Sequence, residues 1–444
     1  MSTTKPSIGF CGLGAMGFGM ATHFVERGYI VKGFDISQAS LDRFEQAGGV
    51  PVATLQESAE GNDFYICMVA TAQQAQSAIF DDAKPIIKGL PNGATLLLCS
   101  TVPATYAQSV AQQLQQLGRS DISLIDCPVS GGAARAVNGT LTIMAGASPE
   151  AIAKGQWLLK EMSGENKLFI VDGGIGQGSN MKMVHQVLAA IHILAASEGM
   201  GLAVKLGLDP RIVVERVNGS AAWSWMWENR TTRMLNEDYY PGVSALTIIL
   251  KDVCIVTSQA RATTFPVPLS SLAEQVYFSA LNQGYGPHDD AGVLRIYHNT
   301  SLSQTPQSWL SEDEVNKRTN LVITLLTNIH LLAAAEALSF ARHLGIPLDQ
   351  LYGLAVDAAG GSHSLRDVGK LMIRGLSGNE KNWMGVCTHN LDTVVTDLAE
   401  VVGAAQDLKM PLFLGNAVLG AFLGVRMRFG GDIGEAAVLK AYVQ

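Results

Sequence analysis

The sequence predicts an α/β, doubly wound domain followed by two repeated all-α domains. Three observations support this prediction. Short apolar strand patterns alternate with helical patterns over residues 1–173, as in a parallel sheet covered by helices on both faces. Strand patterns then stop, and long helical patterns continue to the last residues. Within this helical part, one stretch of sequence occurs twice.

Length and composition indicate a globular protein with more than one domain. Of the 444 residues, 48% are apolar and 16% are charged, so disorder is disfavoured. A net charge of −8 without a basic tract disfavours nucleic-acid partners and anionic membranes. The first residues show no signal-peptide pattern, and no uninterrupted apolar run reaches membrane-spanning length. We therefore expect no membrane partner.

The six cysteines are spread along the chain, and no two form a CxxC pair. Most lie in apolar runs, where cysteine is usually a small buried residue. This pattern indicates a reducing compartment, so we expect a cytoplasmic protein without a metal site.

A glycine-rich turn follows the first strand pattern and precedes a helical pattern. The turn fits GxGxxG with Gly12, Leu13, Gly14, Ala15, Met16 and Gly17. In a Rossmann-type domain, the first glycine permits the tight turn, the second lets the backbone approach a pyrophosphate, and the third lets helix and strand close up. The free N–H groups of the helix N-terminus bind the anion. A dinucleotide site is the predicted function, and a generic βαβ turn is the alternative.

The second strand pattern ends in Asp35, about 20 residues after the turn, where such domains bind the adenosine ribose. A carboxylate accepts hydrogen bonds from ribose hydroxyls and repels a 2′-phosphate. The next residues, Ile36, Ser37 and Gln38, supply no arginine for that phosphate. The sequence therefore favours NAD over NADP.

Further strand patterns lie at residues 63–70, 94–100, 122–127, 141–146 and 167–172. Ligands of parallel sheets bind beyond the carboxyl ends of the strands. Two polar clusters fall there: Ser100-Thr101, and the loop Ser130-Gly131-Gly132. The loop could offer a hydroxyl and backbone N–H groups to a carboxylate. Taken alone, a glycine pair that ends a strand is an equally good interpretation.

A glycine-rich link after Asp172 predicts a domain boundary near residue 173. The expected domains are 1–173, an all-α domain at 174–305, and a second all-α domain at 312–444, with the polar stretch 299–314 as a linker. The two helical domains are similar in sequence. Residues 191–209 and 329–347 align without gaps at an offset of 138 residues, and nine of nineteen positions are identical.

The repeats differ mainly at polar positions. Lys182, His185 and Gln186 of the first correspond to Asn320, Ile323 and Thr324 of the second, and Lys251 corresponds to Thr396 at an offset of 145. Shared residues are mostly packing residues. We expect the second repeat to keep the shape and to lack the chemistry, either through drift or because it serves as a built-in partner subunit.

Four motifs together resemble those of the β-hydroxyacid dehydrogenases, the family that includes 3-hydroxyisobutyrate dehydrogenase. They are GFCGLGAMGFGMA, DCPVSGGAARAVNGTL, GQGSNMKMVHQ and LKDVCIV, in this order within residues 5–300. The resemblance implies a hydroxy acid substrate, with Lys182 as the general acid/base and Ser130, Gly131 and Gly132 at the substrate carboxylate. It also implies that Thr101 and Lys251 lie in the cofactor region.

Isobutyrate-type members usually carry asparagine at the positions of His185 and Gln186. The pattern here is similar to L-threonate dehydrogenases and other four-carbon sugar-acid dehydrogenases, whose substrates have more hydroxyls. Gln186, four residues after Lys182, shares its helix face and could bind a substrate hydroxyl, and His185 lies one position off that face. The duplicated helical part resembles that of 6-phosphogluconate dehydrogenase. That enzyme, however, has a glutamate where this chain has Ala189, and its NADP preference conflicts with Asp35.

Oxidation of a carbinol requires a base for the hydroxyl proton. A free lysine, with a pKa of about 10.4, is a poor base at neutral pH. Burial and the positive charge of an oxidised nicotinamide both disfavour the ammonium form. The sequence thus predicts Lys182 as that base. The alternative for Lys182 is a solvated lysine at the start of a helix. The alternative for Lys251 is a surface ion pair with Asp252.

The predicted function is NAD-dependent oxidation of a small hydroxy acid, most readily a four-carbon sugar acid such as L-threonate. The alternatives are a 3-hydroxyisobutyrate-type dehydrogenase, a 2-hydroxy-3-oxopropionate reductase and a non-catalytic nucleotide-binding scaffold. Imine reductases share the two-domain plan but usually replace the lysine. With two repeats in one chain, we expect a monomer or a homodimer.

Overall fold

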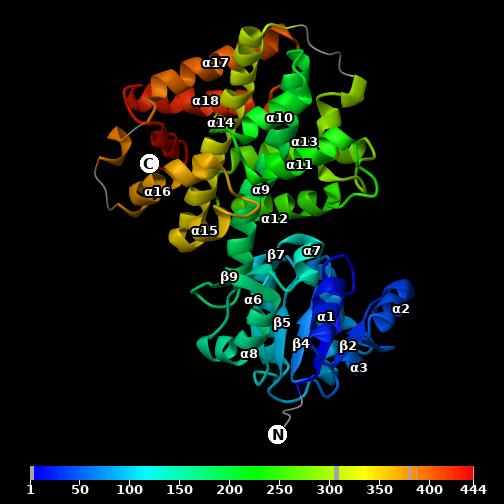
Figure 1. Cartoon of the computed structure of the whole chain (residues 1–444). Coiled ribbons are helices and arrows are strands. Elements are labelled where there is room, and N and C mark those ends of the chain that lie inside the picture. The colour runs from blue at the N-terminus through cyan, green and yellow to red at the C-terminus, as the bar shows by residue number, and fades with distance from the viewer. Residues whose placement is uncertain (1–4, 305–309, 379–381, 387, 444) are drawn as a thin grey trace. The chain divides into compact units, whose positions relative to one another are not determined.

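The computed structural model describes residues 5–304, 310–378, 382–386 and 388–443. Two compact units make up the chain, Met1–Lys182 and Met183–Gln444. The first contains strands and helices, and the second is helical (Figure 1). Part of the predicted linker, residues 305–309, lies outside the described residues, as does Cys387.

A six-stranded parallel sheet with the order β3-β2-β1-β4-β5-β6 forms the centre of the first unit. Its strands are β1 (Ile8–Cys11), β2 (Val31–Phe34), β3 (Val50–Pro51), β4 (Phe64–Cys67), β5 (Thr95–Leu98) and β6 (Ser123–Asp126). The chain builds outward from β1 in one direction and then from β4 in the other. The topological switch point therefore lies between β1 and β4, where such sheets bind ligands.

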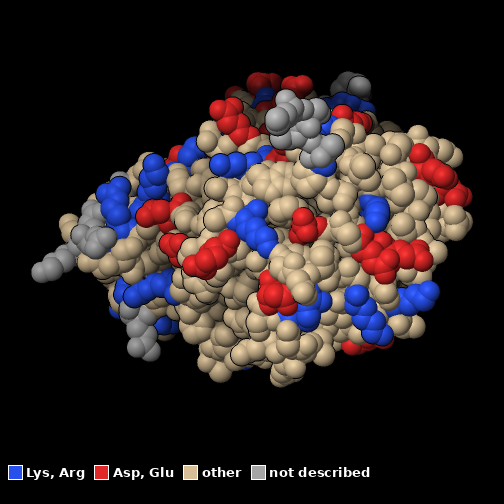
Figure 2. Space-filling model, turned by 90° about the horizontal axis from the view of Figure 1, so that it is seen from below, with Lys and Arg blue, Asp and Glu red and all other residues tan. Residues whose placement is uncertain are grey.

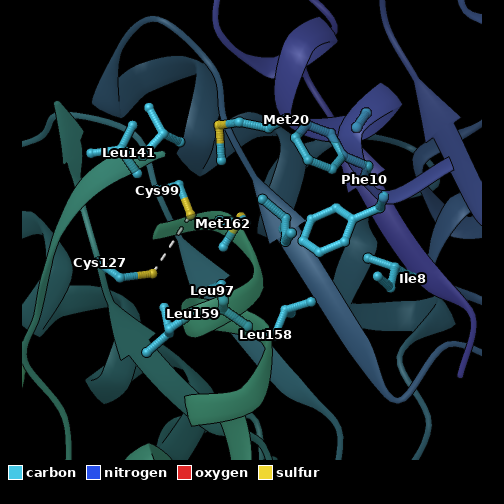
Figure 3. Close-up of a cluster of buried hydrophobic side chains, with 14 of the residues drawn as sticks. Ile8, Phe10, Met20, Leu97, Cys99, Cys127, Leu141, Leu158, Leu159 and Met162 are labelled. Atoms are coloured by element: carbon cyan, nitrogen blue, oxygen red, sulfur yellow. Dashed lines mark hydrogen bonds between the residues drawn. The ribbon is translucent and has the colours of Figure 1, made fainter. Parts of the chain in front are cut away.

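Helices cover both faces of this sheet, which confirms the predicted fold class. They are α1 (Gly17–Glu26), α2 (Gln38–Gln46), α3 (Leu55–Ala59), α4 (Ala72–Gln76), α5 (Ile86–Gly89), α6 (Ala104–Gln116) and α8 (Pro149–Met162), with a π-helical turn at Ser77–Asp81. Because side chains alternate along a strand, Leu97 packs with the α1 and α8 side chains (Figure 3), whereas Leu96 and Leu98 pack on the opposite face with those of α6.

The last strands of the unit form a separate small sheet, whereas the sequence predicted further strands of one mostly parallel sheet. Strand β7 (Val129–Ser130) pairs antiparallel with β8 (Leu141–Ala145), and β8 pairs parallel with β9 (Ser163–Ile170). The chain turns back between β7 and β8 through helix α7 (Gly132–Val137). This reversal places the loop Ser130–Gly132 at the end of β7 rather than inside the large sheet.

The helical unit consists of two repeats. Its first long helix, α9 (Gln177–Lys205), begins in the first unit and continues into the second. The first repeat continues with α10 (Pro210–Asn218), α11 (Trp225–Asn236), α12 (Leu246–Ala262), α13 (Pro268–Asn282) and the 3₁₀ turns at Asp290–Ile296 and Leu302–Gln304. The second contains α14 (Glu312–His343), α15 (Leu348–Ala355), α16 (His363–Ser377), a 3₁₀ turn at Trp383–Gly385, α17 (Leu391–Asp407), α18 (Phe413–Phe429) and the 3₁₀ turn at Glu435–Ala441.

Reciprocal contacts join the repeats as in a two-fold dimer. The carboxylate of Glu198 accepts hydrogen bonds from the backbone N–H groups of Leu414 and Gly415, at the start of α18, at 3.0 and 2.8 Å. Glu336, its equivalent, accepts from the N–H groups of Leu269 and Ser270, at the start of α13, both at 2.9 Å. Each repeat therefore caps a helix of the other.

Two further pairs of equivalent residues meet each other. The rings of His192 and His330 lie edge to face, with centroids 4.4 Å apart. Ser224 and Ser362 form an antiparallel bridge. Because equivalent residues can meet only on a two-fold axis, these pairs mark the local symmetry axis of the helical unit.

Helices α9 and α14 are long and apolar enough to span a membrane by length and composition. However, their most apolar windows are 94% and 78% buried, so they are core helices of the protein. On the face shown in Figure 2, acidic and basic side chains are interspersed over a mostly uncharged surface.

Candidate active site

The turn after β1 has the geometry that dinucleotide binding requires. Gly12 has φ = +90°, which favours glycine. A Cβ on Gly17 would collide with the carbonyl oxygen of Gly12, so helix α1 can start only with glycine there. A Cβ on Gly14 would meet nothing within 4 Å, so the backbone of Gly14 faces open space. The residues present therefore fit a pyrophosphate at the start of α1.

Asp35 follows β2 and is held beside this turn. Its Oδ2 accepts a hydrogen bond from the N–H of Leu13 at 2.6 Å, and its Oδ1 accepts from the N–H of Ser37 at 2.8 Å. A carboxylate has about four acceptor positions, so ribose hydroxyls can still bind. The structure thus places Asp35 at the turn, as the sequence predicted.

A cation that the sequence analysis missed lies at the same turn. Arg43, on α2, donates a hydrogen bond to the carbonyl oxygen of Leu13 at 3.3 Å, and its guanidinium lies 3.7 Å from the ring centroid of Phe18. Arg43 lies beyond Ile36, Ser37 and Gln38 in the sequence, and helix α2 brings it back to the turn.

The other predicted sites of the first unit also lie at carboxyl ends of strands. Thr101 follows β5. Ser130 ends β7, and Gly131, with φ = +136°, starts helix α7. Helix α7 packs on α1, where a Cβ on Gly19 would lie 2.9 Å from Val137 Cγ2. Helix α7, which follows the Ser130–Gly132 loop, thus packs on the helix that follows the dinucleotide turn.

Asp126 holds the start of the lysine helix, a role that the sequence analysis did not assign. Its Oδ2 accepts from the N–H groups of Gly176 and Ser179 at 3.1 and 2.8 Å, and its Oδ1 accepts from Ser179 Oγ at 2.6 Å. Burial raises the pKa of Asp126 to about 6, although these hydrogen bonds oppose the shift. Lys182 follows in the next turn of α9 and is 6% exposed, which excludes a solvated lysine.

In the second unit, four polar side chains form a chain of contacts. His185 Nδ1 lies 3.2 Å from Gln186 Oε1, and Gln186 Nε2 donates to Asp252 Oδ2 at 2.5 Å. Lys251 Nζ forms an ion pair with Asp252 Oδ1 at 3.2 Å. The ion pair considered as the alternative role of Lys251 is thus present, and Asp252 is its buried partner.

The predicted site residues thus fall into two groups. The dinucleotide turn, Asp35, Thr101, the Ser130–Gly132 loop and Lys182 belong to the first unit. His185, Gln186 and Lys251 belong to the second, and α9 carries residues of both groups. Among the described residues, no cluster of three or more His, Cys, Asp or Glu side chains is arranged to hold a metal ion.

Family models match most of the chain. The NAD-binding domain of 6-phosphogluconate dehydrogenase matches residues 7–173. The NAD-binding model of NADP-dependent 3-hydroxyisobutyrate dehydrogenase matches twice, at residues 176–297 and 317–442, which agrees with the duplication.

Individual relatives are similar to two thirds or more of this chain. The L-threonate dehydrogenase of Cupriavidus necator is 36% identical over 296 residues, 67% of this chain and 97% of the relative. A crystal structure of a 3-hydroxyisobutyrate dehydrogenase from Salmonella typhimurium covers 66% of this chain and 100% of its own, at 33% identity and a TM-score of 0.60. The 6-phosphogluconate dehydrogenase of Plasmodium falciparum, at 15% identity, shares the fold over 94% of this chain and 92% of its own, with a TM-score of 0.67.

The fold, the dinucleotide turn and these matches define a β-hydroxyacid dehydrogenase, an oxidoreductase with an NAD(P)-binding domain. Within this class, the chain belongs to the 3-hydroxyisobutyrate dehydrogenase family.

Proposed function

We propose that this enzyme oxidises a four-carbon sugar acid such as L-threonate with NAD, and that Lys182 is the general acid/base. The position of Lys182 carries this proposal. The side chain is buried, at 6% exposure, and its helix is fixed at the first turn by Asp126. Burial favours the neutral amine that a proton acceptor requires.

The residues of the first unit have distinct tasks in this reaction. Ser130 Oγ and the N–H groups of Gly131 and Gly132 bind the substrate carboxylate. Lys182 accepts the hydroxyl proton during oxidation and returns it during reduction, which contributes roughly 10²–10⁴-fold to the rate. The bound dinucleotide supplies the hydride acceptor. Thr101 contacts the cofactor region.

The substrate class rests on His185 and Gln186. Both are buried polar side chains, and we expect the Gln186 amide to bind a second hydroxyl of a sugar acid. Ala189 stands where 6-phosphogluconate dehydrogenase has its acid for decarboxylation, so the carbon chain stays intact. A 3-hydroxyisobutyrate-type activity is the second candidate, because the Salmonella typhimurium relative carries that name.

The cofactor preference rests on Asp35. We expect Asp35→Ala to narrow the preference for NAD over NADP, because the carboxylate then no longer repels a 2′-phosphate. Arg43→Ala is the matched variant. It should lower any NADP activity, because a 2′-phosphate would lose a nearby cation, and it should leave the KM for NAD within about twofold, because Arg43 is exposed. An unchanged NAD/NADP ratio in Asp35→Ala would contradict the proposed ribose contact.

Initial rates of NADH formation test the substrate. The panel contains L-threonate, D-erythronate, 3-hydroxyisobutyrate, glycerate and 6-phosphogluconate, each with NAD. The proposal expects the highest kcat/KM with a four-carbon sugar acid. A higher value with 3-hydroxyisobutyrate would favour the second candidate, and no turnover of any acid would favour a non-catalytic scaffold.

A further inference from the structure

A turn of the second repeat reaches a side chain of the first. The N–H of Gly360, in the turn between α15 and α16, donates a hydrogen bond to His185 Nε2 at 3.2 Å. His185 is fully buried. The two residues are 175 positions apart in the sequence, so only the fold of the duplicated unit brings them together.

This contact fixes the proton positions of the neighbouring side chains. A backbone N–H can only donate, so His185 Nε2 must be the unprotonated nitrogen. The proton of the neutral ring is then on Nδ1, which donates to Gln186 Oε1 at 3.2 Å. The Gln186 amide nitrogen in turn faces Asp252 Oδ2 at 2.5 Å.

The groups at both ends of this chain of hydrogen bonds fix the direction in which each bond is donated. The Gly360 amide is a pure donor, and the Asp252 carboxylate is a pure acceptor, held further by its ion pair with Lys251. A flipped Gln186 amide would bring its NH₂ against the His185 N–H and its oxygen against the carboxylate. Two repulsive contacts would replace two hydrogen bonds, so one orientation is strongly favoured.

We propose that Gly360 is a positioning residue, through which the second repeat sets the tautomer of His185 and thereby the orientation of Gln186. The nitrogen edge of the Gln186 amide then donates hydrogen bonds. It selects substrates that present a hydroxyl oxygen there, as a polyhydroxy acid does, over acids with a methyl group. This inference rests on the proposed function, in which Gln186 contacts the substrate.

The turn approaches Leu188 closely at Gly360. A Cβ on Gly360 would lie 3.0 Å from Leu188 Cδ1 and 3.2 Å from Leu188 Cβ, which is tighter than ordinary packing. The turn is also anchored at the local axis, where Trp225 N–H donates to Gly361 O at 2.9 Å and His363 N–H donates to Trp223 O at 3.1 Å.

The equivalent turn of the first repeat makes no such contact. At the offset of 138, Gly360 corresponds to Ala222, and His185 corresponds to Ile323. The N–H of Ala222 donates to Ser220 Oγ at 3.1 Å, within its own turn. Isoleucine could accept no hydrogen bond. The contact therefore runs in one direction only, from the repeat without the lysine to the repeat that carries it.

Nitrogen NMR of the full-length chain with ¹⁵N-labelled histidine tests the tautomer without any substrate. His185 is assigned by the signals lost in His185→Gln. We expect an Nδ1–H tautomer in the wild type and a second population in Gly360→Ala. Gly353→Ala, where a Cβ would meet nothing within 4 Å, is the matched control and should leave the signals unchanged. An Nε2–H tautomer in the wild type would overturn the inference.

Kinetics test the consequence for specificity. In Gly360→Ala we expect the KM for the four-carbon sugar acid to rise about tenfold, with kcat and the KM for 3-hydroxyisobutyrate within about twofold, as for one lost hydrogen bond. Asp252→Asn should raise the KM for the sugar acid more than the KM for 3-hydroxyisobutyrate, because an amide lets Gln186 flip, and it serves if Gly360→Ala does not fold. Equal KM changes for both acids in these variants would overturn the inference.

The two experiments separate the two proposals. If the enzyme oxidises no hydroxy acid, the proposed function fails, and the tautomer measurement still decides the role of Gly360. If the sugar acid is oxidised but His185 carries its proton on Nε2, the proposed function stands and the role of Gly360 is wrong.

Discussion

The two helical repeats share their packing contacts and differ in their polar chemistry. Glu198 and Glu336 make matching helix caps, and His192 and His330 meet at the axis. In contrast, Asp252 is buried beside Gln186 and Lys251, whereas its equivalent Asp397 is exposed.

This difference between the repeats separates the residues that packing requires from those that the polar chemistry requires. Packing at a two-fold axis constrains both partners, because every contact is made twice. A catalytic site constrains only one copy. The second repeat retains the packing contacts of the first, and its Gly360 donates to His185, although Asn320 stands at the position of Lys182.

The largest expected difference between the repeats is the effect on kcat of replacing Lys182 or its equivalent, Asn320. We expect Lys182→Ala to lower kcat by roughly 10²–10⁴-fold, because the proton acceptor is lost. Asn320→Ala, at the equivalent position, should leave kcat within about twofold, because Asn320 is exposed. Steady-state rates of NADH formation measure both.

Two controls accompany this comparison. NAD binding to Lys182→Ala, followed by fluorescence titration, should match the wild type, because no contact of Lys182 with the adenosine half is proposed. Lys205→Ala removes an exposed lysine from the same helix and should not affect the rate. A near-normal kcat in Lys182→Ala would show that another group accepts the proton.

The sequence predicted the features that depend on local pattern. The strand and helix alternation, the GxGxxG turn and the repeat were all found, because each is contained in a continuous stretch or in a comparison of two stretches. The strand patterns at 141–146 and 167–172 overlap β8 and β9, but their separation into a second sheet was not predicted, because β7 consists only of Val129 and Ser130.

Three site residues, Asp126, Asp252 and Arg43, were not predicted, because their contacts join distant parts of the sequence. Asp126 binds a residue 53 positions away, and Gln186 binds Asp252 across 66 positions. Arg43 reaches Leu13 across 30. Nothing in the local sequence distinguishes these side chains from surface charges or turn residues. Their roles follow from which elements become neighbours in the folded chain.

The second comparison tests whether the glutamate caps are equivalent. Glu198→Gln and Glu336→Gln should each lower the free energy of unfolding by about 2 kcal/mol, because an amide leaves at least one buried N–H without an acceptor. Burial raises the pKa of both carboxyls, to about 7 for Glu198. Urea unfolding near pH 8, above the pKa of Glu198, measures the two losses. Unequal losses would mean that the repeats do not share this contact equally.

His192 and His330, which meet at the local axis, should give a smaller, pH-dependent effect on the free energy of unfolding. Burial lowers the pKa of His192 from 6.5 to about 3, and that of His330 also falls well below its usual value. Below pH 6.5 the unfolded chain takes up protons that these buried rings do not, so stability falls as the pH falls. From about pH 6.5 to 5, each histidine costs about 2 kcal/mol.

His192→Phe and His330→Phe should therefore each lose less stability than the wild type between pH 8 and 5. None of the four ring nitrogens has a hydrogen-bond partner among the described residues, so phenylalanine sacrifices no such bond. Asp126 and Glu198 shift stability the other way, because their raised pKa values favour the folded state as the pH falls. That contribution is the same in all three proteins and cancels when the losses are compared. Identical pH dependence in wild type and variants would contradict the buried neutral pair.

The smallest expected effect concerns the serines at the axis. Ser224 Oγ accepts from the N–H of Trp227, and Ser362 Oγ accepts from the N–H of Leu365, both at 3.2 Å, so each caps its helix. Ser224→Ala and Ser362→Ala should each cost about 1 kcal/mol in urea unfolding. Because the contacts of Gly361 with Trp225 and of His363 with Trp223 are made by the backbone, neither variant should change the KM for the acid substrate. A KM increase in Ser362→Ala alone would show that this cap, and not only the Gly360 amide, holds the turn against His185.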